Sequence, residues 1–302
     1  MAKPVHRAKV KATTRAGKAA SRILDAKIEN VREHVPAAMV GDVDGIHDMR
    51  VAVKRLRESM RLFRKLLPTK RRQRIYPQVE LLNDTLGEVR ERDVLCLDAE
   101  ELGHDIEDDG GLLEASISAW QSERDEAFTH LLKVWSRMTG EGFFDALEEV
   151  ARRTKKRGRR TNRLDVERFA YEAIRRAMDR VDERLGPALE SEDPALLHRL
   201  RIGIKRLKYS MEPFRDFLPL MKEPYKVVSD AQELLGLTHD LDVLRDRLAA
   251  HIEAVDDDRL TAAEGVLALL DRRRGERYAQ SRQVITVFAE PQFTRSMLDA
   301  ID

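Results

Sequence analysis

The sequence predicts an all-α protein made of two similar halves, and three observations lead to this prediction. Strand-like alternation of apolar and polar residues is nearly absent, whereas apolar residues recur at steps of three and four. A block of 22 residues occurs twice, with eleven identical positions and no gap, at an offset of 151 residues. Because this offset is half of the 302-residue length, we interpret the chain as a duplicated unit.

The helical pattern divides the chain into a tail, two halves and a junction. Residues 1–17 form a basic tail that we expect to be mobile. The first half, 18–152, is predicted to contain helices at 18–40, 45–67, 70–102, 112–137 and 142–152. The segment 153–163 is a basic junction. The second half, 164–302, is predicted to contain helices at 165–189, 194–218, 222–254, 258–288 and 292–301. Each half thus offers four main helices with an apolar seam, which is the makeup of a four-helix bundle.

The first copy of the repeated block predicts a helix with an apolar seam and a cationic stripe. The seam consists of Ile46, Met49, Val53, Leu56, Met60, Phe63 and Leu67. The stripe consists of His47, Arg50, Lys54, Arg57, Arg61 and Arg64. Each member of the stripe follows a seam residue by one position, or about 100° around the helix, so the cations border the buried face.

The second copy repeats both features. Its seam consists of Leu197, Leu200, Ile204, Leu207, Met211, Phe214 and Leu218. Its stripe consists of His198, Arg201, Lys205, Lys208 and Arg215. Glu212 interrupts this stripe at the position of Arg61, which predicts a weaker second wall at its far end. Pro213 is expected to kink the helix because proline removes a backbone donor and crowds the preceding turn.

Start and stop signals frame both repeated helices. Asp42 or Asp44 is a candidate cap for the first helix, and Asp193 followed by Pro194 is a good start for the second. Pro68 and Pro219 mark the two ends.

A solvated helix face is the ordinary explanation of a charged stripe, but this stripe is almost purely cationic. Like charges one turn apart destabilise a helix by a few tenths of a kcal/mol per pair, roughly. A feature that opposes its own helix and still occurs in both halves is better explained by an anionic partner.

A second block follows each cationic helix. Residues 86–95 match residues 235–244, at an offset of 149. Gly87 and Gly236 lie in mid-helix, where we expect the close approach of a neighbouring helix. Asp93 and Asp242 are expected to pair with basic residues of the repeated helices. Arg90 stands opposite His239 in this alignment, so the two halves differ there.

The amino-acid composition excludes several classes of protein. The net charge is only +1, but residues 47–74 carry eleven Lys or Arg against two acids, and residues 88–109 carry ten acids. The single cysteine excludes an internal disulfide. No apolar run approaches the ~20 residues of a membrane span, and the N-terminus lacks a secretory apolar core. We therefore expect a cytoplasmic protein without a membrane partner.

The motif His-x-x-Arg-x-x-x-Lys-Arg-Leu-Arg/Lys, at His47 and again at His198, resembles the CHAD family, the conserved histidine α-helical domain. The Leu-Gly blocks at 86–95 and 235–244 are similar to that family too, and the resemblance covers roughly residues 18–300. It implies two four-helix bundles, related by a pseudo-twofold axis, around a central basic channel. It also implies binding of inorganic polyphosphate, often at polyphosphate granules.

The resemblance places eight residues in the channel: His47, Arg50, Lys54, Arg57, His198, Arg201, Lys205 and Lys208. Arg55 and Arg206 match the motif as well, although their helical phase turns them away from the stripe. Polyphosphate suits such a surface because Arg binds phosphate oxygens in a bidentate manner and Lys binds them as a point charge. A stripe of seventeen residue steps is about 26 Å long, which is enough for several phosphates.

Three functions other than polyphosphate binding are possible. Nucleic-acid binding is the strongest, because residues 1–22 and 151–163 are basic, but Trp120 and Trp135 lie outside the stripes and offer no stacking platform. An enzyme is not predicted, since no phosphate-cradling glycine loop, nucleophile elbow or magnesium-binding carboxylate cluster stands out, and a phosphohistidine at His47 or His198 is a lesser alternative. No metal site and no cofactor are predicted, because each repeated histidine is followed by an arginine three residues later.

Overall fold

The computed structural model describes residues 6–107, 109–161, 164–191, 193–252 and 259–299. Within these ranges the fold is all-α, and the pairing Arg15–Asp165 is an isolated β-bridge. The first half contains α1 (Ala16–Ala38), α2 (Val43–Leu62), α3 (Thr69–Gly103), α4 (Leu112–Gly140) and α5 (Phe143–Thr161). The second half contains α6 (Val166–Glu190), α7 (Pro194–Met211), α8 (Lys222–Ala249), α9 (Leu260–Ile285) and α10 (Pro291–Asp299), with short 3-10 helices at Pro219–Met221 and Thr286–Ala289.

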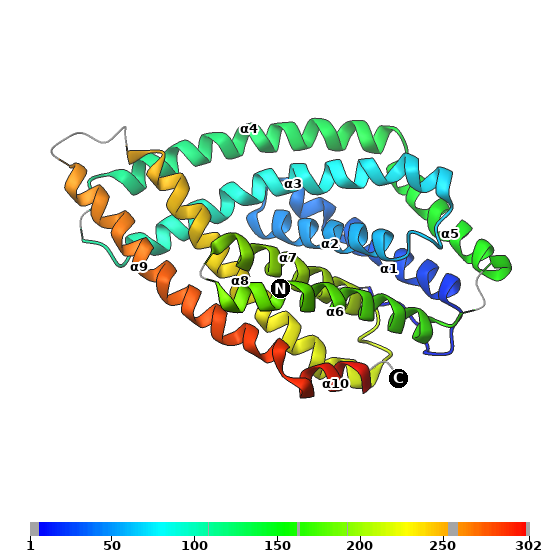
Figure 1. Ribbon diagram of the computed structural model, residues 1–302. Helices are drawn as coiled ribbons and strands as arrows, with labels where there is room; N and C mark the ends of the chain where they lie inside the picture. Colours follow the sequence, from blue (N-terminus) through cyan, green and yellow to red (C-terminus); the bar gives the residue numbers. More distant parts are fainter. Residues whose placement is uncertain (1–5, 108, 162–163, 192, 253–258, 300–302) are drawn as a thin grey trace.

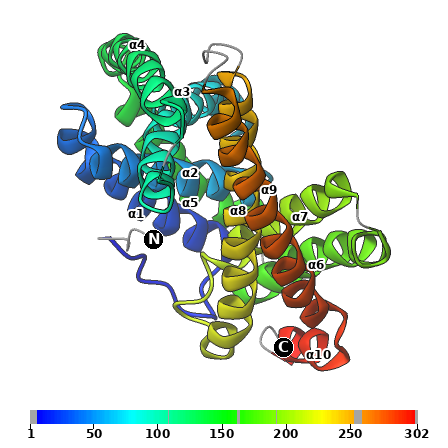
Figure 2. The same cartoon turned by 90° about the vertical axis from the view of Figure 1, so that its left-hand side faces the viewer.

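The two repeated helices occupy the middle of the molecule (Figure 1). Helix α2 packs against α1 and α3, whereas α7 packs against α6 and α8. The two helices also contact each other, and α1 contacts α6. Helices α8 and α9 form a long pair that reaches from α10 to the far ends of α3 and α4 (Figures 1 and 2). This arrangement brings the cationic stripes of both halves toward one interior.

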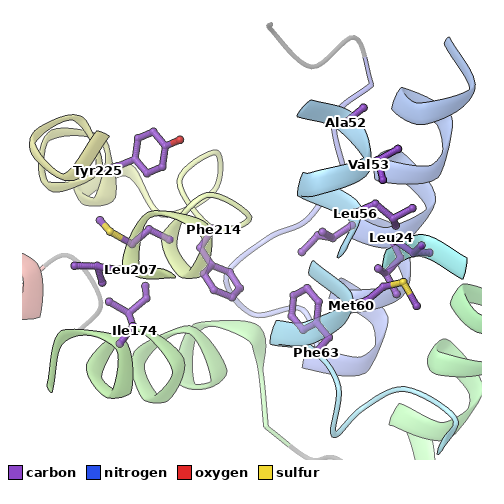
Figure 3. Packing of buried hydrophobic residues seen from close by; sticks show 14 of the residues in the cluster. Leu24, Ala52, Val53, Leu56, Met60, Phe63, Ile174, Leu207, Phe214 and Tyr225 are labelled. Carbon is purple, nitrogen blue, oxygen red and sulfur yellow. The ribbon is translucent and has the colours of Figure 1, made fainter. Parts of the chain in front are cut away.

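One hydrophobic core runs through both halves. Every seam residue predicted from the two repeated blocks is buried in it. Phe63, just after α2, and Phe214, just after α7, meet edge to face with ring centroids 6.2 Å apart (Figure 3). Phe169 of α6 stacks on Phe63 with ring centroids 5.3 Å apart. A second cluster around the fully buried Trp120 joins α3 and α4 to α8 and α9. The halves therefore share their interior and form one folding unit.

The predicted caps are confirmed and the predicted ends are corrected. The Asp42 carboxylate accepts a hydrogen bond from the Gly45 amide at 2.6 Å, and the Asp193 carboxylate accepts one from the Ala195 amide at 2.9 Å. Helices α2 and α7 end at Leu62 and Met211, several residues before the prolines that were expected to end them. Pro213 lies in the turn after α7, so it ends the helix and does not kink it, because it cannot donate to the preceding turn.

The tail and the junction differ from their predictions as well. Residues 6–15, expected to be mobile, lie against α1, where the Asn30 side chain binds both the amide and the carbonyl of His6 at 3.0 and 2.8 Å. Ala8, Val10 and Ala12 add apolar contacts that explain why this segment stays attached. The basic junction is mostly helical, because α5 continues to Thr161. Residues 1–5 and 162–163 lie outside the described part.

The repeated aspartates have structural partners on other helices than predicted. Asp93 accepts a hydrogen bond from Arg124 Nε of α4 at 2.7 Å, and Asp242 pairs with Arg274 of α9. Both arginines come from the helix that follows the block, not from the repeated cationic helix. The aspartates therefore fix α4 to α3 and α9 to α8, which leaves the cations of α2 and α7 without these partners.

Candidate functional site

Five cationic side chains from both halves gather between α2 and α7, and we call them the central cluster. They are Arg50 and Lys54 of α2, Arg90 of α3, and Arg201 and Lys205 of α7. Lys54 and Lys205 are direct neighbours, and Lys54 Nζ lies 5.6 Å from the centroid of the Tyr209 ring. The structure thus brings together the middle of both predicted stripes.

The central cluster lacks compensating ion pairs. No carboxylate oxygen of the described residues lies within 4.0 Å of the charged nitrogens of its five members. Asp240 of α8 attracts both Arg50 and Arg201 from a greater distance, while loss of hydration raises the pKa of Asp240 itself. A partly buried group of like charges is costly in the free protein, and an anion entering it would relieve the mutual repulsion.

Arg201 shows this incompleteness at the level of one atom. Its Nε is buried and has no hydrogen-bond partner among the described residues. Buried donors in folded proteins are nearly always paired, and an orphaned one costs about 1–3 kcal/mol. An acceptor oxygen supplied by a ligand would satisfy this donor.

Burial and repulsion lower the pKa of the lysines. Burial, assisted by Lys205, Arg50 and Arg57, lowers the pKa of Lys54 to about 6. Burial also lowers the pKa of Lys205, with Arg201 as the next cause. Near neutral pH Lys54 is therefore largely uncharged in the free protein, which limits the repulsion that its neighbours experience.

The histidines form the edge of the site. Burial and the nearby Arg90 lower the pKa of His47, and burial and Arg201 lower that of His198. The rings of His198 and His239 lie 5.3 Å apart, and burial together with Arg201 lowers the pKa of His239 to about 4. All three are neutral near pH 7 and act there as hydrogen-bonding groups rather than fixed cations.

Several predicted residues point away from the central cluster. Arg55 is buried, and its Nε pairs with Glu212 at 3.0 Å. Lys208 is 2% exposed and donates a hydrogen bond to Gln232 Oε1 at 2.7 Å. Arg57 differs from these two residues: it pairs with Glu58, with Nη2 to Oε1 at 2.8 Å, but lies close enough to repel Lys54 and Lys205. A step of one residue rotates a side chain by about 100°, which is enough to move it from one neighbouring helix to the next.

The far ends of the two stripes separate. Arg61, Arg64 and Arg206 line a surface groove beside α6. Arg215 instead lies with its guanidinium 4.6 Å from the Tyr225 ring centroid. Glu212 was expected to face the ligand and weaken one wall, but its side chain is 5% exposed and pairs with Lys27 as well as Arg55. It belongs to the packed interior.

Sequence reasoning compared Arg90 with His239 without assigning either to the site. Arg90 acts on His47 and His239 lies against His198, so these equivalent positions contact equivalent histidines. Their spacing offered a signal, because each lies three residues after the repeated glycine, on the same helix face. A Cβ at Gly87 would lie 3.8 Å from Arg50 Nε, so this glycine faces a side chain of the cluster and not the backbone of a neighbouring helix.

No three His, Cys, Asp or Glu side chains in the described part of the chain are grouped so that they could hold a metal ion. None of the helices in the described ranges is long and apolar enough to cross a membrane.

Two solved structures are similar to the chain. The crystal structure of the CHAD domain from the plant Ricinus communis has a TM-score of 0.71 and 20% identity, covering 93% of this chain and 96% of that chain. PptA from Streptomyces chartreusis has a TM-score of 0.59 and 14% identity, covering 91% of this chain and 99% of that chain. No curated protein matches the sequence. At such identities the two structures establish the fold. The family model described as the CHAD domain matches residues 22–249, and since this is well over half of the sequence, the chain belongs to the CHAD family.

Proposed function

We propose that the protein binds inorganic polyphosphate without catalysing a reaction, and that the polymer occupies the central cluster between α2 and α7. The observation that carries this proposal is the set of five cations with no carboxylate partner in the described residues, one of which buries an unsatisfied Nε. Membership of the CHAD family supports the choice of ligand.

The chemistry of the ligand fits these cations. Each internal phosphate of polyphosphate carries about one negative charge, and its oxygens accept charge-assisted hydrogen bonds from guanidinium and ammonium groups. One arginine and one lysine of α2 and one arginine and one lysine of α7 would bind the chain from both helices.

The cellular setting belongs to the same proposal. A polymer-binding protein without a membrane-spanning helix in its described part is suited to the cytoplasm, at the surface of polyphosphate granules. Localisation of a fluorescent fusion relative to stained granules tests this part separately from the binding itself.

A competition experiment tests the ligand. Labelled long-chain polyphosphate is bound to the protein and displaced by unlabelled polyphosphate, single-stranded DNA or RNA at equal phosphate concentration and several salt concentrations. We expect polyphosphate to displace the label far better than either nucleic acid. We also expect a plot of log Kd against log salt concentration to have a slope of roughly 3 to 4. The reason is that about 0.7 counterions are released per neutralised phosphate of a single strand, and the cluster has five cations. Equal displacement by nucleic acid, or an affinity insensitive to salt, would overturn the assignment.

Binding is expected to be coupled to proton uptake at Lys54. In the free protein its pKa is lowered to about 6, so at pH 8 the amine is neutral. A bound polyanion stabilises the charged form and raises this pKa, so the complex holds more protons than the free protein. Affinity should therefore rise as the pH falls from 8 toward 6, and the part of this rise that depends on Lys54 should end below the pKa of the free amine.

Calorimetry at pH 8 in buffers of different ionisation enthalpy measures the protons taken up, at a pH where the histidines stay neutral. Lys54→Gln should remove about one proton from the wild-type value. The control is Lys226→Gln, whose amine pairs with Asp230 on the exposed face of α8. Unchanged uptake in Lys54→Gln would contradict this coupling.

A further inference from the structure

The open groove beside the central cluster is the feature that reaches beyond the proposed site. It is a cavity of about 330 Å³ between α2, α6 and α7, lined by six cationic side chains. They are Arg61, Arg64, Lys65, Arg176, Arg180 and Arg206. Arg61 and Arg176 have carboxylate neighbours within their own helices, Glu58 at 3.8 Å and Glu172 at 3.7 Å. The remaining four have no carboxylate within 4.0 Å among the described residues.

The groove adjoins the central cluster at Tyr209. Tyr209 lines the groove, and the same ring lies 5.6 Å from Lys54 Nζ. Glu58 also lines the groove and attracts Lys205. Arg206 follows Lys205 directly on α7, and the nearby Arg61, Arg184 and Arg180 add to burial in lowering its pKa. A polyanion leaving the cluster past Tyr209 would therefore meet further uncompensated cations.

The other half has a corresponding cavity that is much smaller. With the repeat offset of 151, Arg61, Arg64 and Lys65 correspond to Glu212, Arg215 and Asp216. These three line a cavity of only about 30 Å³ between α1 and the turn after α7. Two of the cations that line the open groove therefore correspond to acids in the small cavity.

Two further contacts restrict that second cavity. Glu212 pairs with Lys27 Nζ and Arg55 Nε, both at 3.0 Å, so Lys27 already has an anionic partner. The N-terminal residues His6, Arg7 and Ala8 cover the same cavity, and Asn30 holds His6 in place through its backbone. A ligand would have to displace packed chain and a buried ion pair to enter.

We infer that polyphosphate is held asymmetrically, running from the central cluster into the open groove of α2, α6 and α7 and not into its counterpart at α1. This inference rests on the proposed function and adds a second, exposed segment to the binding site. Chains long enough to reach from Lys54 past Tyr209 to Arg180 gain these contacts, whereas short chains fill the central cluster alone.

The test compares two ligands and two charge-reversed variants. Arg176→Glu/Arg180→Glu removes two groove cations, and Arg168→Glu/Arg175→Glu makes the same change in net charge at exposed positions of the same helix that do not line the groove. Affinities for tripolyphosphate and for long-chain polyphosphate are measured at several salt concentrations. For the long chain we expect at least tenfold weaker binding in the groove variant than in the control variant. Its salt slope should fall by roughly 1.4, at about 0.7 per lost contact.

Each outcome decides a different point. Equal affinity of both variants for the long chain would overturn the asymmetric path, and so would an equal loss for tripolyphosphate, because the groove would then belong to the short ligand's own site. Failure of the wild-type protein to bind either polyphosphate would instead overturn the proposed function.

Discussion

The double variant Arg50→Ala/Arg201→Ala is expected to lose about 2–6 kcal/mol of polyphosphate binding free energy, or about 1–3 kcal/mol for each charge-assisted contact. The two arginines come from opposite sides of the central cluster, so the variant removes one cation from each wall. Because they lie in one electrostatic network, the combined loss is expected to differ from the sum of the two single losses.

Folding should survive this change. Both guanidinium groups are partly buried without a carboxylate partner, so their desolvation opposes folding and their removal should not lower the free energy of unfolding. Titration calorimetry gives the affinity, and urea denaturation gives the stability. Arg168→Ala/Arg175→Ala, on the exposed face of α6, controls for net charge. Wild-type affinity in the Arg50/Arg201 variant would refute the model of two walls.

Replacement of Glu212 by glutamine is expected to lower the free energy of unfolding by about 3–5 kcal/mol, the usual cost of breaking a buried ion pair from one side. Glu212 holds Lys27 of α1 and Arg55 of α2 from the turn after α7, and all three side chains are largely buried. The change leaves two cations in the interior without their anion. Asp230→Asn, which breaks an exposed pair with Lys226, should cost about 0–1 kcal/mol.

The pH dependence of stability and a triple variant that makes all three side chains apolar test the same role of Glu212. Burial tends to raise the pKa of Glu212, but Lys27 and Arg55 outweigh it, so the folded-state pKa lies below the ordinary value of about 4.3. The stability from this group is present above that ordinary value and is lost as the pH falls through the folded pKa, and Glu212→Gln should lack this loss. Lys27→Met/Arg55→Met/Glu212→Leu should recover most of the stability, because apolar side chains often replace a buried ion triad at little cost. A loss below 1 kcal/mol in Glu212→Gln would contradict the structural role.

Periodicity predicted the helices and both buried seams because a helix that packs in a core needs one continuous apolar stripe. The repeat also predicted that cations of α2 and α7 approach each other, and Arg50, Lys54, Arg201 and Lys205 do so. Helical phase alone could not place Lys208, since a side chain at the edge of a stripe is directed by whichever partner is nearest, here Gln232.

The residues that sequence reasoning misplaced depend on contacts distant in the chain. Glu212 is 185 residues from Lys27, and no local pattern relates them. The tail was expected to be mobile because it is basic, but the Asn30 side chain and three small apolar residues hold its described part. Just beyond the early ends of α2 and α7, Phe63 and Phe214 meet each other, a contact across 151 residues that no local pattern predicts.

That aromatic meeting point has a consequence for how the two copies diverged. Neither half can be lost or separated without exposing Phe63 or Phe214 to water, so each half depends on the other to keep its ring buried. Once the fold depends on the pair, the copies no longer need to carry the same charges. One copy keeps Arg61 and Lys65 at its surface, while the other places Glu212 and Asp216 at the matching positions and uses the glutamate to hold the interior. Fusion through a shared core thus permits a division of labour between two originally equal halves.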